Sequence, residues 1–93
     1  MNNKKPREER LTLKQSRDMA YEKFRRNIRI LRAGIDISAV ELAGKLKLKN
    51  GKRYVDLEYG RANPTTEELL CISKNFSVTI DELLFKKAKI TFE

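Results

Sequence analysis

The chain contains 93 residues, which suit one domain and leave no room for two. It has 21 Lys and Arg against 13 Asp and Glu, so its formal net charge is +8, and it has no His and one Cys. These counts exclude a His-based catalytic triad, a His or thiolate metal site and an internal disulfide. No apolar run approaches the ~20 residues of a membrane span, so we expect no membrane partner. We further expect a cytoplasmic protein without a cofactor or a metal.

The positive charge is concentrated at the front of the chain. Residues 1–32 carry 11 basic and 4 acidic side chains, residues 33–64 carry 6 and 4, and residues 65–93 carry 4 and 5. A basic front and middle with a near-neutral end predicts one positive face. Such a face favours a polyanionic partner.

The order of polar and apolar stretches divides the chain into three parts. Residues 1–15 open with a polar run and are expected to form a flexible basic arm. Residues 16–88 carry the regular apolar pattern and are expected to form the folded domain. Residues 89–93 remain as a C-terminal tail.

The first helix is indicated by its apolar spacing. Phe24, Ile28 and Leu31 recur at i, i+4 and i+7, which predicts a helix over residues 16–33. Gly34 follows, and glycine commonly ends a helix in the left-handed conformation. We therefore expect this helix to stop at Gly34.

Three later helix starts share the capping box, in which Ser or Thr stands three residues before Glu. These boxes are Ser38–Glu41, Thr65–Glu68 and Thr79–Glu82, and they predict helices over 38–46, 66–76 and 80–88. Asn50 as a cap and Gly60 as a terminator predict another helix over 51–59. The fold class is therefore all-α with five helices, and only the short Ile90–Thr91–Phe92 run resembles a strand.

The middle of the chain resembles the Cro/repressor-type helix-turn-helix family, often called XRE-like. The resemblance rests on Leu42-Ala43, on Tyr54 and on Leu57-Glu58-Tyr59-Gly60-Arg61-Ala62-Asn63-Pro64, and it covers roughly residues 20–85. It implies a five-helix lambda-repressor-like domain in which helix 51–59 is the recognition helix of the DNA major groove.

Two features depart from the family pattern. The turn Leu46-Lys47-Leu48-Lys49-Asn50 lacks the usual Gly and holds one extra residue. Ala39 stands where the family often has a Gln that touches a phosphate or a base. We expect the fold to survive both changes, whereas individual base contacts do not transfer.

The resemblance also implies roles for single residues. Arg32 and Glu58 occupy positions that form an ion pair in the family, against the alternative of two unconnected surface charges. Lys52 and Arg53 stand where a recognition helix reaches guanine, and Asp56 is placed to accept from cytosine N4. The alternative for these three is a solvated charged face.

Other residues flank the expected DNA contact. Phosphate contacts are expected from the helix start at Ser38 and from Lys49, Arg61 and Asn63. Asn50 is expected to cap the recognition helix, and Cys71 is expected to be an incidental, solvent-facing thiol.

A homodimer is expected to be the active species, formed through the C-terminal part of the chain. One recognition helix covers too few base pairs for selective binding. The apolar residues expected at the interface are Ile80, Leu84, Phe85, Ile90 and Phe92. The alternative is that Phe85 and Phe92 fold back onto the first helix and leave a monomer.

The function expected from these features is sequence-specific binding of double-stranded DNA by a transcriptional regulator, specifically a repressor on a palindromic operator. The alternative is a protein-interaction module, such as the antitoxin subunit of a toxin–antitoxin pair. An enzyme is not expected, because the sequence holds no acid/base constellation and no phosphate-cradling glycine loop. No small-molecule ligand is evident.

Overall fold

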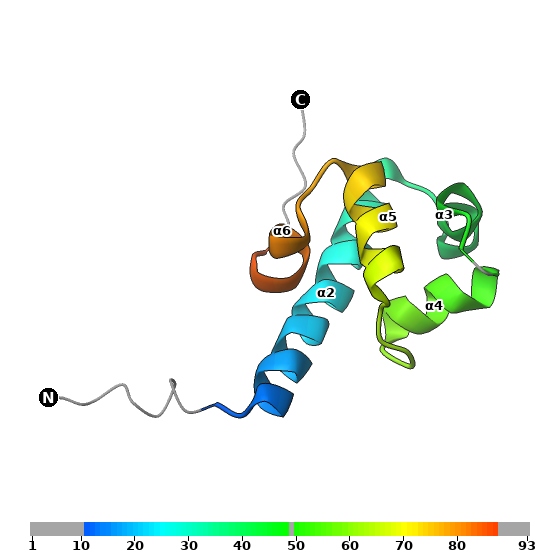
Figure 1. Cartoon of the computed structure of the whole chain (residues 1–93). Helices are drawn as coiled ribbons and strands as arrows, with labels where there is room; N and C mark the ends of the chain where they lie inside the picture. The colour runs from blue at the N-terminus through cyan, green and yellow to red at the C-terminus, as the bar shows by residue number, and fades with distance from the viewer. Residues whose placement is uncertain (1–10, 49, 88–93) are drawn as a thin grey trace, which may run out of the picture.

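A computed structural model describes residues 11–48 and 50–87, and all their regular elements are α-helices. In chain order these are α2 (Leu13–Ile35), α3 (Ala39–Leu46), α4 (Gly51–Tyr59), α5 (Thr66–Phe76) and α6 (Ile80–Phe85). In Figure 1 the long α2 has α6 on one side and the α3–α4 pair on the other, and α5 contacts α6 and α3. None of these helices is long and apolar enough to cross a membrane.

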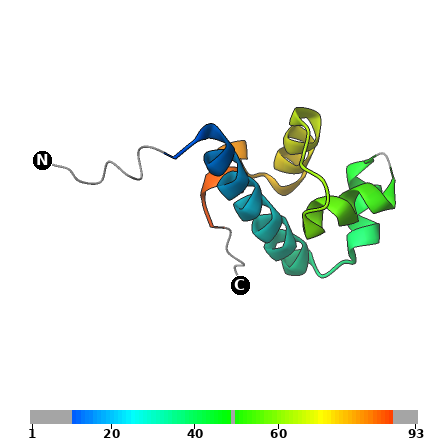
Figure 2. The ribbon, with the colours of Figure 1, turned by 90° about the horizontal axis from the view of Figure 1, so that it is seen from below.

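The core lies where the apolar stripe of α2 meets the shorter helices. Its fully or almost fully buried side chains are Phe24, Ile28, Leu42, Ala43, Leu46, Tyr54, Leu57, Ile72 and Leu83. The helical spacing of Phe24 and Ile28 thus correctly predicted the inner face of α2. Residues 11–19, at the start of α2, are exposed. Figure 2 shows α6 beside this end of α2 and the α3–α4 pair beside its other end.

The helix starts follow the predicted caps. All three capping boxes are present, and in each the hydroxyl accepts from the backbone N–H three residues later. Asn50 caps α4 by accepting from the Arg53 N–H at 2.8 Å. A fourth box, formed by Thr12 and Gln15, starts α2 and was missed in the sequence.

Two predicted helices had wrong bounds. α2 begins at Leu13 rather than residue 16, because Thr12 caps it, and it runs through Gly34 to Ile35. Asp36 takes the left-handed conformation instead, with φ 55°. α6 ends at Phe85 rather than residue 88, where Lys86 is already extended. Ile90 and Phe92 lie outside the described residues.

Candidate nucleic-acid interface

α3 and α4 form two short helices joined by a tight turn. Lys47 ends α3 in the left-handed conformation with φ 55°, and the Leu48 N–H closes the turn on the Ala43 carbonyl at 3.3 Å. The start of α4 lies close to the start of α3, since a β-carbon at Gly51 would stand 3.8 Å from Val40 Cγ1.

A partly buried ion pair docks α4 on α2. Arg32 Nε and Nη2 donate to the Glu58 carboxylate at 2.7 and 2.8 Å, and the Glu58 side chain is only 3% exposed. Arg32 Nη1 also donates to the Ile37 carbonyl, which ties the α2–α3 connection to the same guanidinium. Burial beside the Glu58 carboxylate raises the pKa of the Tyr54 hydroxyl well above its usual value. The parallel fork fixes the angle at which α4 leaves the body.

Two further arginines of α2 lie at the C-terminal end of α4. Gly60 ends α4 with φ 79°, and a β-carbon there would come within 2.8 Å of Arg25 Nε. Arg29 Nη1 donates to the Glu58 carbonyl at 3.0 Å. Cations are favourable at this end because the last carbonyls of a helix carry partial negative charge. These contacts could not be inferred from the sequence, because they join residues 29 or more positions apart.

The structure uses Arg53 differently from the prediction. Its Nε and Nη2 donate to the Glu68 carboxylate at 2.6 and 2.7 Å, and Nη2 also donates to the Asn63 carbonyl at 2.9 Å. Reading a guanine needs a free fork of the same kind. Without DNA, Arg53 thus forms a structural contact between α4 and α5, and its expected base contact stays a prediction.

The exposed face of α4 carries a second charged group. Lys52 Nζ donates to Asp56 Oδ2 at 2.9 Å, and Arg61 Nε donates to Asp56 Oδ1 at 3.0 Å. The Arg61 guanidinium also lies 5.1 Å from the centre of the Tyr59 ring. The hydrogen bonds from Lys52 and Arg61 hold the pKa of Asp56 below its usual value. Asp56 is thus already paired at the position where it was expected to meet cytosine.

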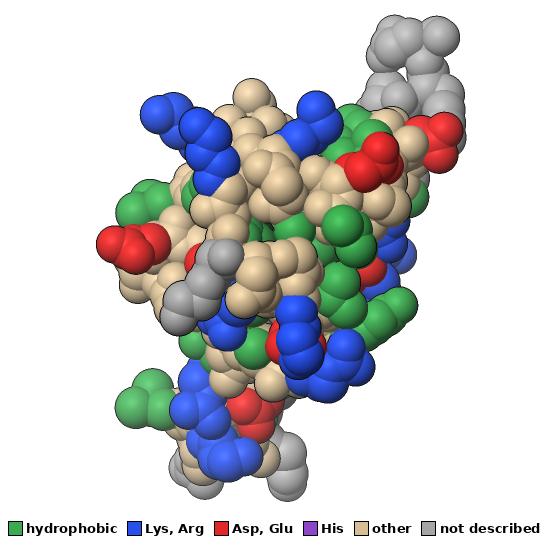
Figure 3. Space-filling model, turned by 90° about the vertical axis from the view of Figure 1, so that its right-hand side faces the viewer, with side chains coloured by type: hydrophobic (Ala, Val, Ile, Leu, Met, Phe, Trp, Pro, Cys, Tyr) green, Lys and Arg blue, Asp and Glu red, His purple; other side chains and the backbone are tan. Residues whose placement is uncertain are grey.

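The remaining predicted contacts are distributed around this face. Ser38, Asn50 and Asn63 are exposed, whereas Ala39 is partly buried against the core. Lys49 lies outside the described residues. The exposed cations of α3, of α4 and of the turns that follow these helices are Lys45, Lys47, Lys52 and Arg61. Figure 3 views the molecule from this side and shows basic side chains spread across it, with fewer acidic ones between them.

The predicted solvent-facing thiol is also corrected. Cys71 is half-buried, and its Sγ donates to the Leu46 carbonyl at 3.2 Å. The thiol therefore covers the C-terminal end of α3. The spacing of residues along α5 could not predict this contact, because Leu46 belongs to α3 and meets Cys71 only where α3 packs against α5.

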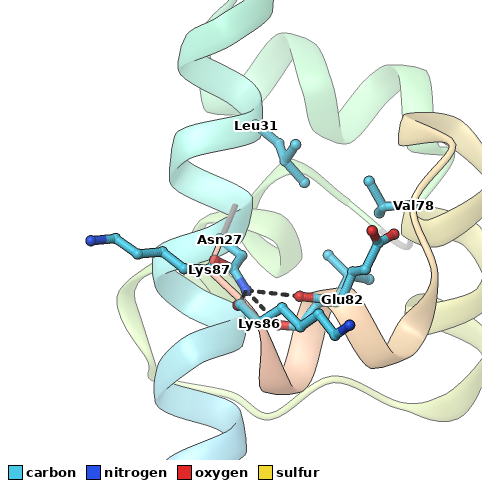
Figure 4. A pocket seen from close by; sticks show the side chains of 7 residues that line it. Asn27, Leu31, Val78, Glu82, Lys86 and Lys87 are labelled. Carbon is cyan, nitrogen blue, oxygen red and sulfur yellow. Dashed lines mark hydrogen bonds between the residues drawn. The ribbon is translucent and has the colours of Figure 1, made fainter. Parts of the chain in front are cut away.

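A cavity of about 340 Å³ lies away from α4, between α2 and α6. Figure 4 shows Asn27 inside it, with Nδ2 donating to the carbonyls of Glu82 at 3.2 Å and Lys86 at 2.7 Å; a third bond reaches Leu83 at 2.8 Å. Asn27 is 1% exposed, so this amide holds the end of α6 onto α2. The arrangement is structural and lies apart from the charged face of α4.

One curated protein resembles this chain. Over 68 residues the chain is 40% identical to the HTH-type transcriptional activator BcrR of Enterococcus faecalis. The alignment covers 73% of this chain and 33% of that protein, so the chain spans about one third of the length of its relative. No family model and no solved structure matches the chain. The similarity is therefore to a helix-turn-helix regulator, over most of the present chain.

Proposed function

We propose that this chain binds double-stranded DNA as the helix-turn-helix domain of a transcriptional regulator, with α4 in the major groove. The observation that carries the proposal is the docking of α4 by the partly buried Arg32–Glu58 pair, which leaves the opposite face of α4 exposed. A short helix held rigidly at its inner face, with cations on its outer face, suits a groove lined by phosphates. The name of the relative supports the same function.

The geometry suggests which residues make the contacts. Lys52 and Arg61 are 78% and 58% exposed, and we assign them to phosphates beside the groove. Lys45 and Lys47 extend the basic surface beyond α4. Ser38 marks the start of α3, an end of the helix that can bind phosphate. Its own N–H donates to Glu41 Oε1 at 2.9 Å, so any phosphate there would meet the N–H groups that follow it. Arg53 is left out of this set because Glu68 holds it.

We further propose that two copies bind a palindromic site. One α4 contacts only a few base pairs, and a two-fold pair sets half-sites about 34 Å apart. The described candidate for the interface is α6, where Phe85 is 59% exposed and Ile80 and Leu84 are half-buried. Whether binding represses or activates a gene depends on where the site lies relative to the promoter. The same contacts therefore serve either a repressor, which the sequence suggested, or an activator, which is the role in the name of the relative.

The test is selection of bound duplexes from a random-sequence pool, followed by affinity measurements across a salt series. We expect an enriched palindrome, and a slope of log K against log salt of about −5 to −9 if a dimer neutralises roughly 6–10 phosphates. Lys52→Ala should weaken binding, whereas Lys74→Ala, in the last turn of α5, removes the same charge and should not. Absence of enrichment together with a flat salt response would refute the proposal.

A further inference from the structure

A single carboxylate lies between the two most prominent cations of α4 and the turn after it. Both oxygens of Asp56 are occupied, one by Lys52 at 2.9 Å and one by Arg61 at 3.0 Å. The Asp56 side chain is 18% exposed, while the two cations are mostly exposed. The carboxylate is therefore shielded, and the cations that surround it face outward.

The position of Arg61 depends on the same residue through its backbone. The Arg61 N–H donates to the Asp56 carbonyl at 2.8 Å, and the Ala62 N–H approaches the same oxygen at 3.3 Å. Tyr59 supports the guanidinium from one side. Arg61 is thus held at its backbone, its Nε and its guanidinium plane, which makes the pairing a built feature of the turn.

A carboxylate in this place has a defined effect on DNA affinity. Non-specific binding comes from cations that neutralise phosphates regardless of sequence. Lys52 and Arg61 can each give their full charge to a phosphate only by weakening a bond to Asp56, and Asp56 itself repels the phosphates. Where base contacts fix α4 in the groove of a matching site, these two cations can keep their bonds to Asp56. Non-matching DNA is held by phosphate contacts alone, so it needs the full charge of both cations and bears the whole cost.

We propose that Asp56 determines specificity by restraining Lys52 and Arg61, so that binding to non-matching DNA is weak. This inference rests on the proposed function, and it replaces direct reading of cytosine by Asp56. Asp56 acts through its two neighbouring cations, and its role is to position them. Asp56 thereby limits binding to the phosphate backbone, which is the same in every DNA sequence.

The test compares Asp56→Asn with Asp18→Asn. Asp18 is a matched control, because it also pairs with one Lys and one Arg, at 3.1 and 3.4 Å, and lies on α2 far along the chain from α4. Both variants raise the net charge by one. Each is measured against random-sequence duplex, against the duplex enriched by selection and on immobilised heparin, with thermal unfolding as the check on folding.

We expect Asp56→Asn to bind random-sequence duplex about three- to tenfold more tightly, the range set by releasing two surface ion pairs. Affinity for the enriched duplex should change less than twofold, so the specificity ratio falls, and elution from heparin should require more salt. Asp18→Asn should change each quantity by less than about twofold.

Other outcomes would overturn the inference. Loss of affinity for the enriched duplex alone would mean that Asp56 reads a base directly. Equal effects of the two variants would mean that only net charge matters. If the unmodified chain binds no duplex, the proposed function fails, and the heparin comparison still reports whether Asp56 restrains the two cations.

Discussion

The guanidinium of Arg53 lies parallel to the carboxylate of Glu68 and joins α4 to the first turn of α5. Glu68 also accepts from the Thr65 N–H at 2.8 Å, so the same carboxylate takes part in both the capping box and the ion pair. The side chains of Arg53 and Glu68 are only 26% and 13% exposed. A half-buried bidentate pair of this kind contributes to stability more than an exposed one.

Arg53→Ala should therefore behave as a stability variant. We expect the free energy of unfolding to fall by about 2 kcal/mol, since charge-assisted hydrogen bonds are lost. Glu68→Gln should have a similar effect, and neither variant should alter the base preference found by selection. A relaxed preference at one base pair in Arg53→Ala, absent in Glu68→Gln, would restore Arg53 as a base reader.

The same pair predicts a pH dependence of stability. The Arg53 guanidinium holds the pKa of Glu68 below its usual value of 4.5. A carboxyl whose folded pKa is lowered stabilises the fold above the unfolded pKa, and this contribution is lost as the pH falls through the folded pKa. The stability difference between the unmodified chain and Glu68→Gln should thus be constant above about pH 5 and shrink below pH 4.5.

Denaturant unfolding at several pH values measures this difference. Glu67→Gln is the control, because Glu67 is exposed and no described residue forms an ion pair with it. Its difference from the unmodified chain should stay near zero across the series. A gap for Glu68→Gln that persists unchanged at pH 3 would contradict the assigned role of the ion pair.

How far each feature could be predicted depends on the separation of the residues that make it. The capping box of Thr65 and Glu68 spans three residues and is visible in the sequence. The ion pair of Glu68 with Arg53 spans 15 residues, and it forms only after the loop returns α5 to α4. The pair of Arg32 with Glu58 was expected only through a family resemblance, because spacing alone does not bring these residues together.

Asn27→Asp should unfold or severely weaken the domain. The substitution places a carboxylate oxygen where Nδ2 now donates to the carbonyls of Glu82, Leu83 and Lys86, at the end of α6. Loss of these buried bonds, with charge facing carbonyl oxygens, should cost at least about 3 kcal/mol. Asn75→Asp makes the same chemical change at an exposed amide that donates to the Cys71 carbonyl. Thermal unfolding should show a small shift for Asn75→Asp, and equal shifts would argue against a structural role for Asn27.

Lys47→Gly should stabilise the domain. Lys47 holds φ 55° at the end of α3, a conformation that costs a non-glycine residue about 1 kcal/mol and costs glycine almost nothing. The free energy of unfolding should rise by about that amount. Lys45→Gly removes the same charge inside α3 and should lower the stability instead. The two denaturant midpoints, moving in opposite directions, would locate the strain at the turn.

Phe85→Glu should weaken self-association and leave the monomer folded. Phe85 is 59% exposed at the end of α6, so its ring contributes little to the core of one chain, whereas a symmetry mate would cover it. Loss of one central aromatic residue from an interface raises the dissociation constant at least about tenfold. A point substitution is preferable to truncation after Leu84, which would remove the Lys86 carbonyl that Asn27 holds.

Sedimentation of the full chain over a range of concentrations measures the effect. Leu70→Glu is the matched control, because Leu70 is 55% exposed on α5 and receives the same charge. The Leu70→Glu dimer should dissociate at a higher concentration than the unmodified dimer only if α5 also lies in the interface. An unmodified chain that stays monomeric at high micromolar concentration, or a Phe85→Glu chain that associates unchanged, would exclude the interface at α6 and leave DNA to bring the two copies together.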